Sequence, residues 1–234
     1  MLYLIGLGLN ESSVSSEALD AIKKSEKVYL ENYTVEFSYS QETLEKQIGK
    51  KVIPADREFV EQKIDELLKE AKEKDVALLI YGSPLTATTH ITIIQEAKKK
   101  KIPVKVIHAG SIFDAVAETG LQIYKFGKTA SMPGFEADSY TEIVKENQSI
   151  KAHTLILIDI GLSFHDALDK LIRDTQKNNI SLDKIIICSR LGTSDSKIFY
   201  DSLKNLKEKE VAVPFCMIIP SELHFVEKEF LESI

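Results

Sequence analysis

Cysteine is scarce in this chain of 234 residues, which contains only Cys188 and Cys216. Both lie within runs of apolar residues, so we predict two buried free thiols rather than a disulfide. No Cys-x-x-Cys pair is present, and the five histidines show no spacing typical of a zinc site. The sequence therefore predicts no bound metal.

Long apolar runs and an excess of positive charge are also absent. No run approaches the roughly 20 apolar residues that a membrane-spanning helix needs. Residues 1–6 lack the basic start of a signal peptide and carry only a short apolar run. The formal net charge of -6 disfavours nucleic-acid binding, because neutralising phosphates needs clustered cations. We therefore expect a cytoplasmic, soluble protein without nucleic-acid or membrane partners.

Several common catalytic motifs are missing as well. The chain has no P-loop lysine, no Gly-x-Ser-x-Gly and no His-Glu-x-x-His. The segment from Gly6 resembles the dinucleotide pattern G-x-G-x-x-G, but Glu11 stands at the third glycine position, where its charge would repel a pyrophosphate. We therefore exclude nicotinamide and flavin cofactors. His90 follows three hydroxyl residues, but a lone histidine is more often structural than catalytic, and we assign no catalytic residue.

The first half of the chain alternates short apolar runs with amphipathic segments. A helix is expected after Ser15 or Ser16, with Lys23 and Lys24 in its last turn. Further helices are predicted at 59–74 and 90–100, and strands at 2–5, 28–30, 51–53, 76–81 and 103–108. Strands that alternate with helices are typical of a mostly parallel sheet.

The second half has a different pattern and predicts a mixed sheet with antiparallel character. Residues 121–126 and 128–132 flank Gly127 and resemble a hairpin. Strands are predicted at 154–159, 185–189 and 212–219, and helices at 164–178 and 196–209. The sequence therefore predicts two domains, an N-terminal α/β domain over residues 1–112 and a C-terminal mixed α/β domain over residues 113–234.

Three segments of the first half could meet in one place. Residues 6–10, 82–86 and 109–112 each follow a predicted strand. Because the carboxyl ends of parallel strands lie along one edge of a sheet, we expect a small ligand to bridge these loops.

A further pattern extends along nearly the whole chain. Its segments are Leu4–Leu9, Gly82–Leu85, Ala87–His90, His108–Ile112, Thr119–Lys128, His153–Leu155, Asp159–Ile160 and Glu222–Glu227. Together they resemble the diphthine synthases, which are tetrapyrrole methylase-like S-adenosylmethionine-dependent methyltransferases. The first two segments occur throughout the broader methylase family, whereas Tyr124–Lys128 and Leu223–Glu227 are more specific to diphthine synthases.

The resemblance implies a fold, a reaction and partners. The fold is α/β with two domains, a mostly parallel N-terminal sheet and a mixed C-terminal sheet, and the cofactor in the cleft between them. The expected reaction transfers methyl groups from S-adenosylmethionine, which becomes S-adenosylhomocysteine. The acceptor is the amine of a 3-amino-3-carboxypropyl-modified histidine on translation elongation factor 2, in diphthamide biosynthesis. A homodimer is also expected.

The resemblance also implies cofactor contacts, residue by residue. They fall at Leu9, Ser83, Thr86, Ser111, Ile112, Ile158, Leu191 and Phe215. Ser83 is a departure, because relatives usually carry aspartate there, and we expect its missing charge to weaken cofactor binding. Tyr33 and Tyr124 offer aromatic faces for a methylated cation, although packing is the commoner role of such residues.

Two other functions remain open from the sequence. A methyltransferase acting on a uroporphyrinogen- or precorrin-type macrocycle fits the first-half motifs equally, but the segment Tyr124–Lys128 argues against it. A protein-binding module that kept the fold and lost cofactor affinity is the third interpretation, and Ser83 keeps it open.

Overall fold

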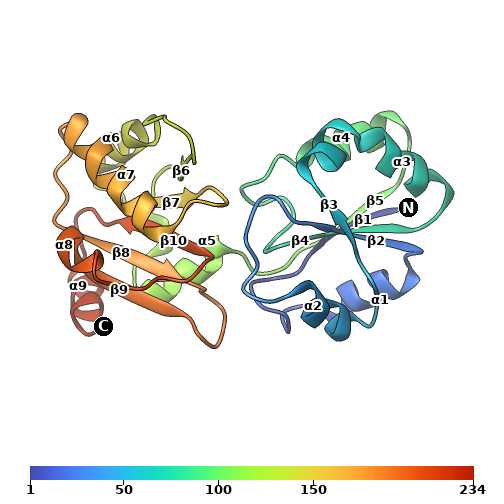
Figure 1. The fold of residues 1–234 in the computed structure, drawn as a ribbon, viewed down its shortest axis with the longest axis horizontal. Coiled ribbons are helices and arrows are strands. Elements are labelled where there is room, and N and C mark those ends of the chain that lie inside the picture. Colours follow the sequence, from blue (N-terminus) through green and yellow to red (C-terminus); the bar gives the residue numbers. More distant parts are fainter. The chain divides into compact units, whose positions relative to one another are not determined.

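Two five-stranded sheets organise the chain (Figure 1). The computed structural model describes residues 1–234, which divide into the units Met1–Ile112 and Phe113–Ile234. Each unit is built around one of the sheets. None of the helices combines the length and the apolar character that crossing a membrane requires.

The sheet of the first unit is entirely parallel, with the strand order β3-β2-β4-β1-β5. Its strands are β1 (Leu2–Gly6), β2 (Lys27–Glu31), β3 (Ile53–Ala55), β4 (Val76–Ile80) and β5 (Val104–Ile107). Its helices are α1 (Ser16–Lys24), α2 (Gln41–Ile48), α3 (Ile64–Glu73) and α4 (Ile91–Lys99), with a π-helical turn η1 at Glu58–Gln62. The short helix α5 (Ile112–Ala115) follows at the junction of the units.

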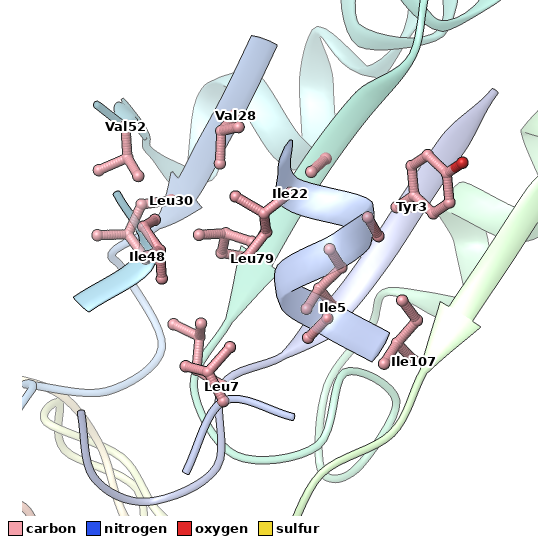
Figure 2. Packing of buried hydrophobic residues seen from close by; sticks show 14 of the residues in the cluster. Tyr3, Ile5, Leu7, Ile22, Val28, Leu30, Ile48, Val52, Leu79 and Ile107 are labelled. Atoms are coloured by element: carbon pink, nitrogen blue, oxygen red, sulfur yellow. The ribbon is translucent and has the colours of Figure 1, made fainter. Parts of the chain in front are cut away.

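Helices cover both faces of this first sheet. Figure 2 shows Ile5 and Leu79 of the central strands near Ile22 of α1, with Leu30 and Ile48 in the same buried cluster. The other face packs on α3 and α4 through a second cluster, whose members include Leu2, Leu4, Leu67, Leu68, Leu78, Ile93 and Ala97. Every residue of β1 and β4 is buried, which explains why both strands consist mainly of apolar residues.

The sheet of the second unit is mixed, with the order β6-β7-β10-β8-β9. Only β6 and β7 run in parallel, and the other pairs are antiparallel. The strands are β6 (Ala130–Met132), β7 (Thr154–Ile158), β8 (Lys184–Ser189), β9 (Lys197–Ser202) and β10 (Phe215–Ile219). The helices are α6 (Tyr140–Ser149), α7 (Phe164–Lys177), α8 (Leu203–Leu206) and α9 (Phe225–Glu232), with 3-10 turns η2 (Val116–Thr119) and η3 (Ile123–Lys125). Helices α6 and α7 pack on one face of this sheet.

The predicted hairpin at residues 121–132 is wrong. Residues Ile123–Lys125 form the turn η3, and Ala130–Met132 pairs in parallel with β7. The backbone at Gly127 instead pairs with a distant partner, because its N–H donates to the carbonyl oxygen of His153 at 2.9 Å. A contact so far along the chain leaves no local signal.

The predicted helix at 196–209 is also wrong, because Lys197–Ser202 forms the edge strand β9. Its residues pair with β8 along the full length of both strands, from Lys184↔Ser202 to Ser189↔Lys197. Ser202 then caps the short helix α8 by accepting a hydrogen bond from the N–H of Asn205. The β-branched and aromatic residues of this segment favour a strand.

Three smaller differences concern a helix and a strand of the first unit and three helices that the sequence did not predict. The predicted helix at 59–74 is interrupted at Lys63, where the backbone is not helical, and α3 begins one residue later. The third strand was predicted at 51–53, whereas β3 spans Ile53–Ala55 and includes Pro54, whose missing N–H is tolerated in an edge strand. Helices α2, α6 and α9 were not predicted.

The two cysteines are free and buried, as predicted. Cys188 of β8 lies directly opposite Cys216 of β10 in the antiparallel register. The hydrogen bond with Cys216 and burial together raise the pKa of the Cys188 thiol well above its usual range. Both thiols are therefore part of the core.

Candidate functional site

Three loops converge at the carboxyl edge of the first sheet. They follow β4, β1 and β5, which are neighbours in the strand order. Gly6 pairs with Ile80, so Gly8 and Gly82 each lie two residues beyond matched positions. Ile5 pairs with Ile107, which places Gly110 at the corresponding level after β5.

Gly8 and Gly82 join two of these loops directly. The N–H of Gly82 donates to the carbonyl oxygen of Gly8 at 2.9 Å, and the reverse bond measures 3.2 Å. Both residues have positive φ, 73° and 67°, which favours glycine. A Cβ on Gly6 would lie 2.6 Å from the carbonyl oxygen of Gly82, so the backbones approach closely there as well.

The third loop lies against the same point. A Cβ built on Gly82 would lie 3.8 Å from both the carbonyl oxygen of Gly110 and the Cα of Ser111. A Cβ on Gly110 would meet nothing within 4 Å. The glycines therefore leave open space beside a surface made of backbone, which is where a ligand could approach the chain closely.

The predicted site residues of the first unit surround these glycines. Ser83 and Ser111 are both more than nine-tenths buried. The Ser83 hydroxyl lies 3.5 Å from Nδ1 of His108, a distance too long for a strong hydrogen bond. Thr86 closes the turn by donating its N–H to the Ser83 carbonyl oxygen at 3.1 Å. Ile112 begins α5, directly after Ser111.

The backbone of Leu9 is held by Tyr81, a residue that the sequence did not single out as part of the site. Its carbonyl oxygen accepts a hydrogen bond from the hydroxyl of Tyr81 at 3.0 Å. The Tyr81 ring packs edge-on against Phe37, and Phe37 packs edge-on against Tyr39. Tyr81 was visible in the sequence only as the residue before Gly82, and nothing there pointed to the loop after β1.

His90 has the structural role that the sequence favoured. The side chain is 1% exposed, and Nδ1 lies 3.1 Å from the carbonyl oxygen of Pro84. Because a carbonyl only accepts, Nδ1 carries the proton and donates. Nε2 has no partner. His90 thus fixes the turn that follows Gly82 from within the core.

Three predicted residues share one edge of the second sheet. Ile158 is the last residue of β7, and Phe215 is the first residue of β10. Phe215 pairs with Ser189 at the end of β8, and the buried Leu191 follows two residues later. The structure therefore gathers the eight predicted positions into two groups, five at the edge of the first sheet and three at the edge of the second.

The chemistry at the edge of the first sheet suits a small polar ligand. The groups offered are backbone amides, two buried hydroxyls and the open space beside Gly82 and Gly110. This combination fits a nucleoside linked to an amino acid, such as S-adenosylmethionine, because such ligands bind through backbone groups and a few placed hydroxyls. No group of three His, Cys, Asp or Glu side chains is placed to hold a metal ion.

The segments Thr119–Lys128 and Glu222–Glu227 meet at Glu227, whose side chain is fully buried. The carboxylate accepts hydrogen bonds from Lys125 Nζ at 2.6 Å, from the Gln122 N–H at 2.9 Å and from the His224 N–H at 2.7 Å. His153 Nε2 lies 3.3 Å away, while His153 Nδ1 accepts from the Ser221 N–H. Burial alone would raise the pKa of Glu227, but these donors lower it to about 2. The pair of motifs therefore anchors α9.

The comparisons with known proteins agree with this geometry. The family model of the tetrapyrrole (corrin/porphyrin) methylases matches residues 1–207. A diphthine methyl ester synthase of Schizosaccharomyces pombe is 36% identical and is aligned over 100% of this chain and 94% of its own length. A diphthine synthase of Methanococcus aeolicus is 35% identical, with coverage of 100% and 98%.

A solved structure supports the same assignment. The crystal structure of a diphthine synthase superposes with a TM-score of 0.93 at 33% identity, over 99% of this chain and 94% of that one. The predicted α/β fold class is thereby confirmed. Similarity of this extent in sequence and in fold leads to one conclusion: the chain belongs to the tetrapyrrole methylases and, within them, to the diphthine synthases, which are methyltransferases.

Proposed function

We propose that this chain transfers methyl groups from S-adenosylmethionine to the 3-amino-3-carboxypropyl-modified histidine of translation elongation factor 2, in diphthamide biosynthesis. The observation that carries the proposal is the full-length similarity to diphthine synthases from archaea and eukaryotes. The joined motifs at Glu227 support it further, because they belong to the part of the sequence that distinguishes diphthine synthases from macrocycle methylases.

The proposed cofactor contacts are those predicted from the sequence. They are Leu9, Ser83, Thr86, Ser111 and Ile112 at the edge of the first sheet, and Ile158, Leu191 and Phe215 at the edge of the second. Support comes from the buried hydroxyls of Ser83 and Ser111 and from the open backbone surface beside Gly82. S-Adenosylmethionine, when bound, supplies a methyl group already activated by its sulfonium.

The chain's own contribution to the reaction is alignment rather than acid–base chemistry. A peptide α-amine has a pKa near 8, and a neighbouring free carboxylate raises it, so a small neutral, nucleophilic fraction of this amine exists at physiological pH without a dedicated base. Holding the acceptor nitrogen in line with the donor methyl can lower the barrier by several kcal/mol. The backbone bonds between Gly8 and Gly82 and the Tyr81 bond to Leu9 keep the loops in the geometry that this alignment needs. No side chain is assigned as an acid or base.

Mass spectrometry of the product tests the proposal. Elongation factor 2 that carries the unmethylated 3-amino-3-carboxypropyl group is incubated with the protein and S-adenosylmethionine. We expect successive gains of one methyl mass on the modified histidine, and mild alkali separates methyl esters from stable N-methyl groups. A uroporphyrinogen-type acceptor serves as the comparison. Methylation of that macrocycle and not of the elongation factor would contradict the proposal and favour the tetrapyrrole alternative.

We also propose that the protein acts in the cytoplasm as a homodimer. The compartment follows from the proposed substrate, a translation factor, and the homodimer from the resemblance to diphthine synthases. Light scattering coupled to size-exclusion chromatography measures the mass directly, and a mass near the monomer's 26.3 kDa would contradict the dimer.

A further inference from the structure

One arginine at the carboxyl edge of the first sheet has no acidic partner. The chain contains three arginines, and two of them, Arg173 and Arg190, form ion pairs. Arg57 forms none, and its guanidinium lies 5.3 Å from the centroid of the Tyr33 ring. An arginine stacked on an aromatic ring keeps its fork of N–H donors free for a planar anion.

Tyr33 and Arg57 follow β2 and β3 at the same edge of the sheet as the glycines of the proposed cofactor loops. Glu31 pairs with Ala55, so Tyr33 and Arg57 each lie two residues beyond matched positions, as Gly82 and Gly8 do. Strand β2 pairs directly with β4. With neighbouring strands about 4.8 Å apart, the ends of β3 and β4, which precede Arg57 and Gly82, lie about 10 Å from each other.

The loop that carries Tyr33 is held in a defined conformation. The buried carboxylate of Glu31 accepts hydrogen bonds from the N–H groups of Tyr33 and Thr34, at 2.8 and 2.9 Å, and from the Thr34 hydroxyl at 2.6 Å. The ring of Tyr33 is therefore a fixed platform for Arg57.

A second contact ties this region to the proposed cofactor loops. Glu61 of the turn η1 accepts a hydrogen bond from the Thr89 hydroxyl at 3.3 Å, and Thr89 belongs to the loop that begins at Gly82. Glu61 also raises the pKa of Tyr33, after the larger effects of burial and of Glu31. The pair Tyr33–Arg57 thus lies beside the loop after β4.

We propose that Arg57, stacked on Tyr33, binds the carboxylate of a 3-amino-3-carboxypropyl group. This inference rests on the proposed function and names the group that the site must recognise beside the reacting atoms. An arginine side chain and an extended aminocarboxypropyl group together span the roughly 10 Å between the ends of β3 and β4. The fork of Arg57 matches a carboxylate with two parallel hydrogen bonds.

The same chemical group occurs in two molecules of the reaction. The acceptor histidine carries it as the modification, and S-adenosylmethionine carries it as the methionine part of the cofactor. The subsite is defined by this shared chemistry, and binding measurements separate the two sources.

The test compares Arg57→Gln and Arg57→Lys with the matched control Lys184→Gln. Lys184 also places a cation over an aromatic ring, that of Tyr200, but in the second sheet and away from the predicted site positions. Calorimetry gives the Kd of S-adenosylmethionine, and steady-state kinetics gives KM and kcat for the modified elongation factor.

The expected result is selective. Arg57→Gln raises the acceptor KM, the cofactor Kd or both by about ten-fold or more, because a charge-assisted pair is lost. Arg57→Lys loses less, since it keeps the charge without the fork. A rise in KM alone assigns the carboxylate to the acceptor, and a rise in Kd alone assigns it to the cofactor. Lys184→Gln changes neither constant.

Two results would overturn the inference. One is an Arg57→Gln variant with unchanged KM and unchanged Kd, and the other is an equal change in Lys184→Gln. The cofactor branch is checked without any acceptor, by comparing the Kd of S-adenosylhomocysteine with that of its analogue lacking the carboxylate. If the wild type fails to methylate the elongation factor, the proposed function fails, and equal ratios of these two Kd values in wild type and Arg57→Gln would then reject the subsite independently.

Discussion

Gly8 and Gly82 face each other through two backbone hydrogen bonds of 3.2 and 2.9 Å, although 74 residues separate them in the chain. The bonds lie just beyond the paired ends of β1 and β4, so they extend the sheet into the loops. Backbone groups held in this way lose little freedom when a ligand binds, which is the condition for a preorganised site.

Gly82→Ala is expected to weaken S-adenosylmethionine binding by about ten-fold or more and to lower the free energy of unfolding by about 1–2 kcal/mol. The stability loss comes from a positive φ of 67°, and the affinity loss from a methyl group in the open space beside Gly110. Calorimetry and urea unfolding measure the two effects.

Gly49→Ala is the matched control, because Gly49 has the same φ of 67° and also has open space around it, but it ends α2. We expect a similar loss of stability and unchanged cofactor affinity. Equal losses of affinity in both variants would mean that general destabilisation, and not the site, explains the result.

Ser83→Asp is expected to tighten S-adenosylmethionine binding by about ten-fold, corresponding to about 1–2 kcal/mol for a charge-assisted hydrogen bond. The resemblance to diphthine synthases predicts aspartate at this position, and the charge of an aspartate would attract the amino group or the sulfonium of the proposed cofactor. Asparagine has nearly the same shape as aspartate but no charge, so Ser83→Asn should leave the affinity close to that of the wild type. An unchanged Kd in Ser83→Asp would refute this explanation of the departure.

Glu227→Gln is expected to destabilise the protein by about 3 kcal/mol near neutral pH, because the Lys125 ammonium and the converging N–H groups lose their charged acceptor. The figure corresponds to the lowering of the Glu227 pKa from 4.5 to about 2. Urea unfolding measures it. Glu229→Gln removes the same charge from an exposed position of α9 and should cost little.

The free energy of unfolding of the wild type should fall in two steps as the pH is lowered. Burial lowers the pKa of His153 in the folded protein, against a smaller opposing effect of Glu227, so the unfolded chain takes up this proton first and stability declines below pH 6.5. The pKa of Glu227 is also lowered, from 4.5 to about 2, so a second loss of stability is expected between these two pH values. Urea midpoints across this range should show both steps in the wild type and only the first in Glu227→Gln. Stability that rises on acidification would contradict the assignment.

The two thiols should be inert in the folded protein. Cys188 and Cys216 are 1% and 2% exposed, and the pKa of Cys188 is raised, so little thiolate is available. We expect no reaction with a thiol-specific chromogenic reagent under native conditions and two equivalents in denaturant. Rapid modification of the native protein would show that the strands β8 and β10 open easily.

The sequence predicted those parts of the fold whose signals are local. Ser15 caps α1 as expected, because a serine before an amphipathic run satisfies the first N–H groups. The three loops after β1, β4 and β5 were also predicted, since short apolar runs mark buried strands. The second unit was harder to predict from the sequence. Strand β9 and the region of Gly127 pair with segments that are distant in the sequence, so neighbouring residues do not reveal these pairings.

The candidate site also combines residues that local motifs reveal with residues that only the three-dimensional structure reveals. Ser83 and Ser111 lie inside motifs and could be named from the sequence, whereas Tyr81 acts on Leu9 from 72 residues away. Arg57 belongs to no motif, and only the register between β2 and β3 places it beside Tyr33. Residues that matter through pairing across a sheet need the structure to reveal them.

A crystal structure with S-adenosylhomocysteine tests the central claim most directly. We expect the nucleoside at the carboxyl edge of the first sheet, in contact with Leu9, Ser83 and Ser111 and covering the backbone of Gly82. A ligand bound at any other surface, or a protein that takes up none at saturating concentration, would contradict the account.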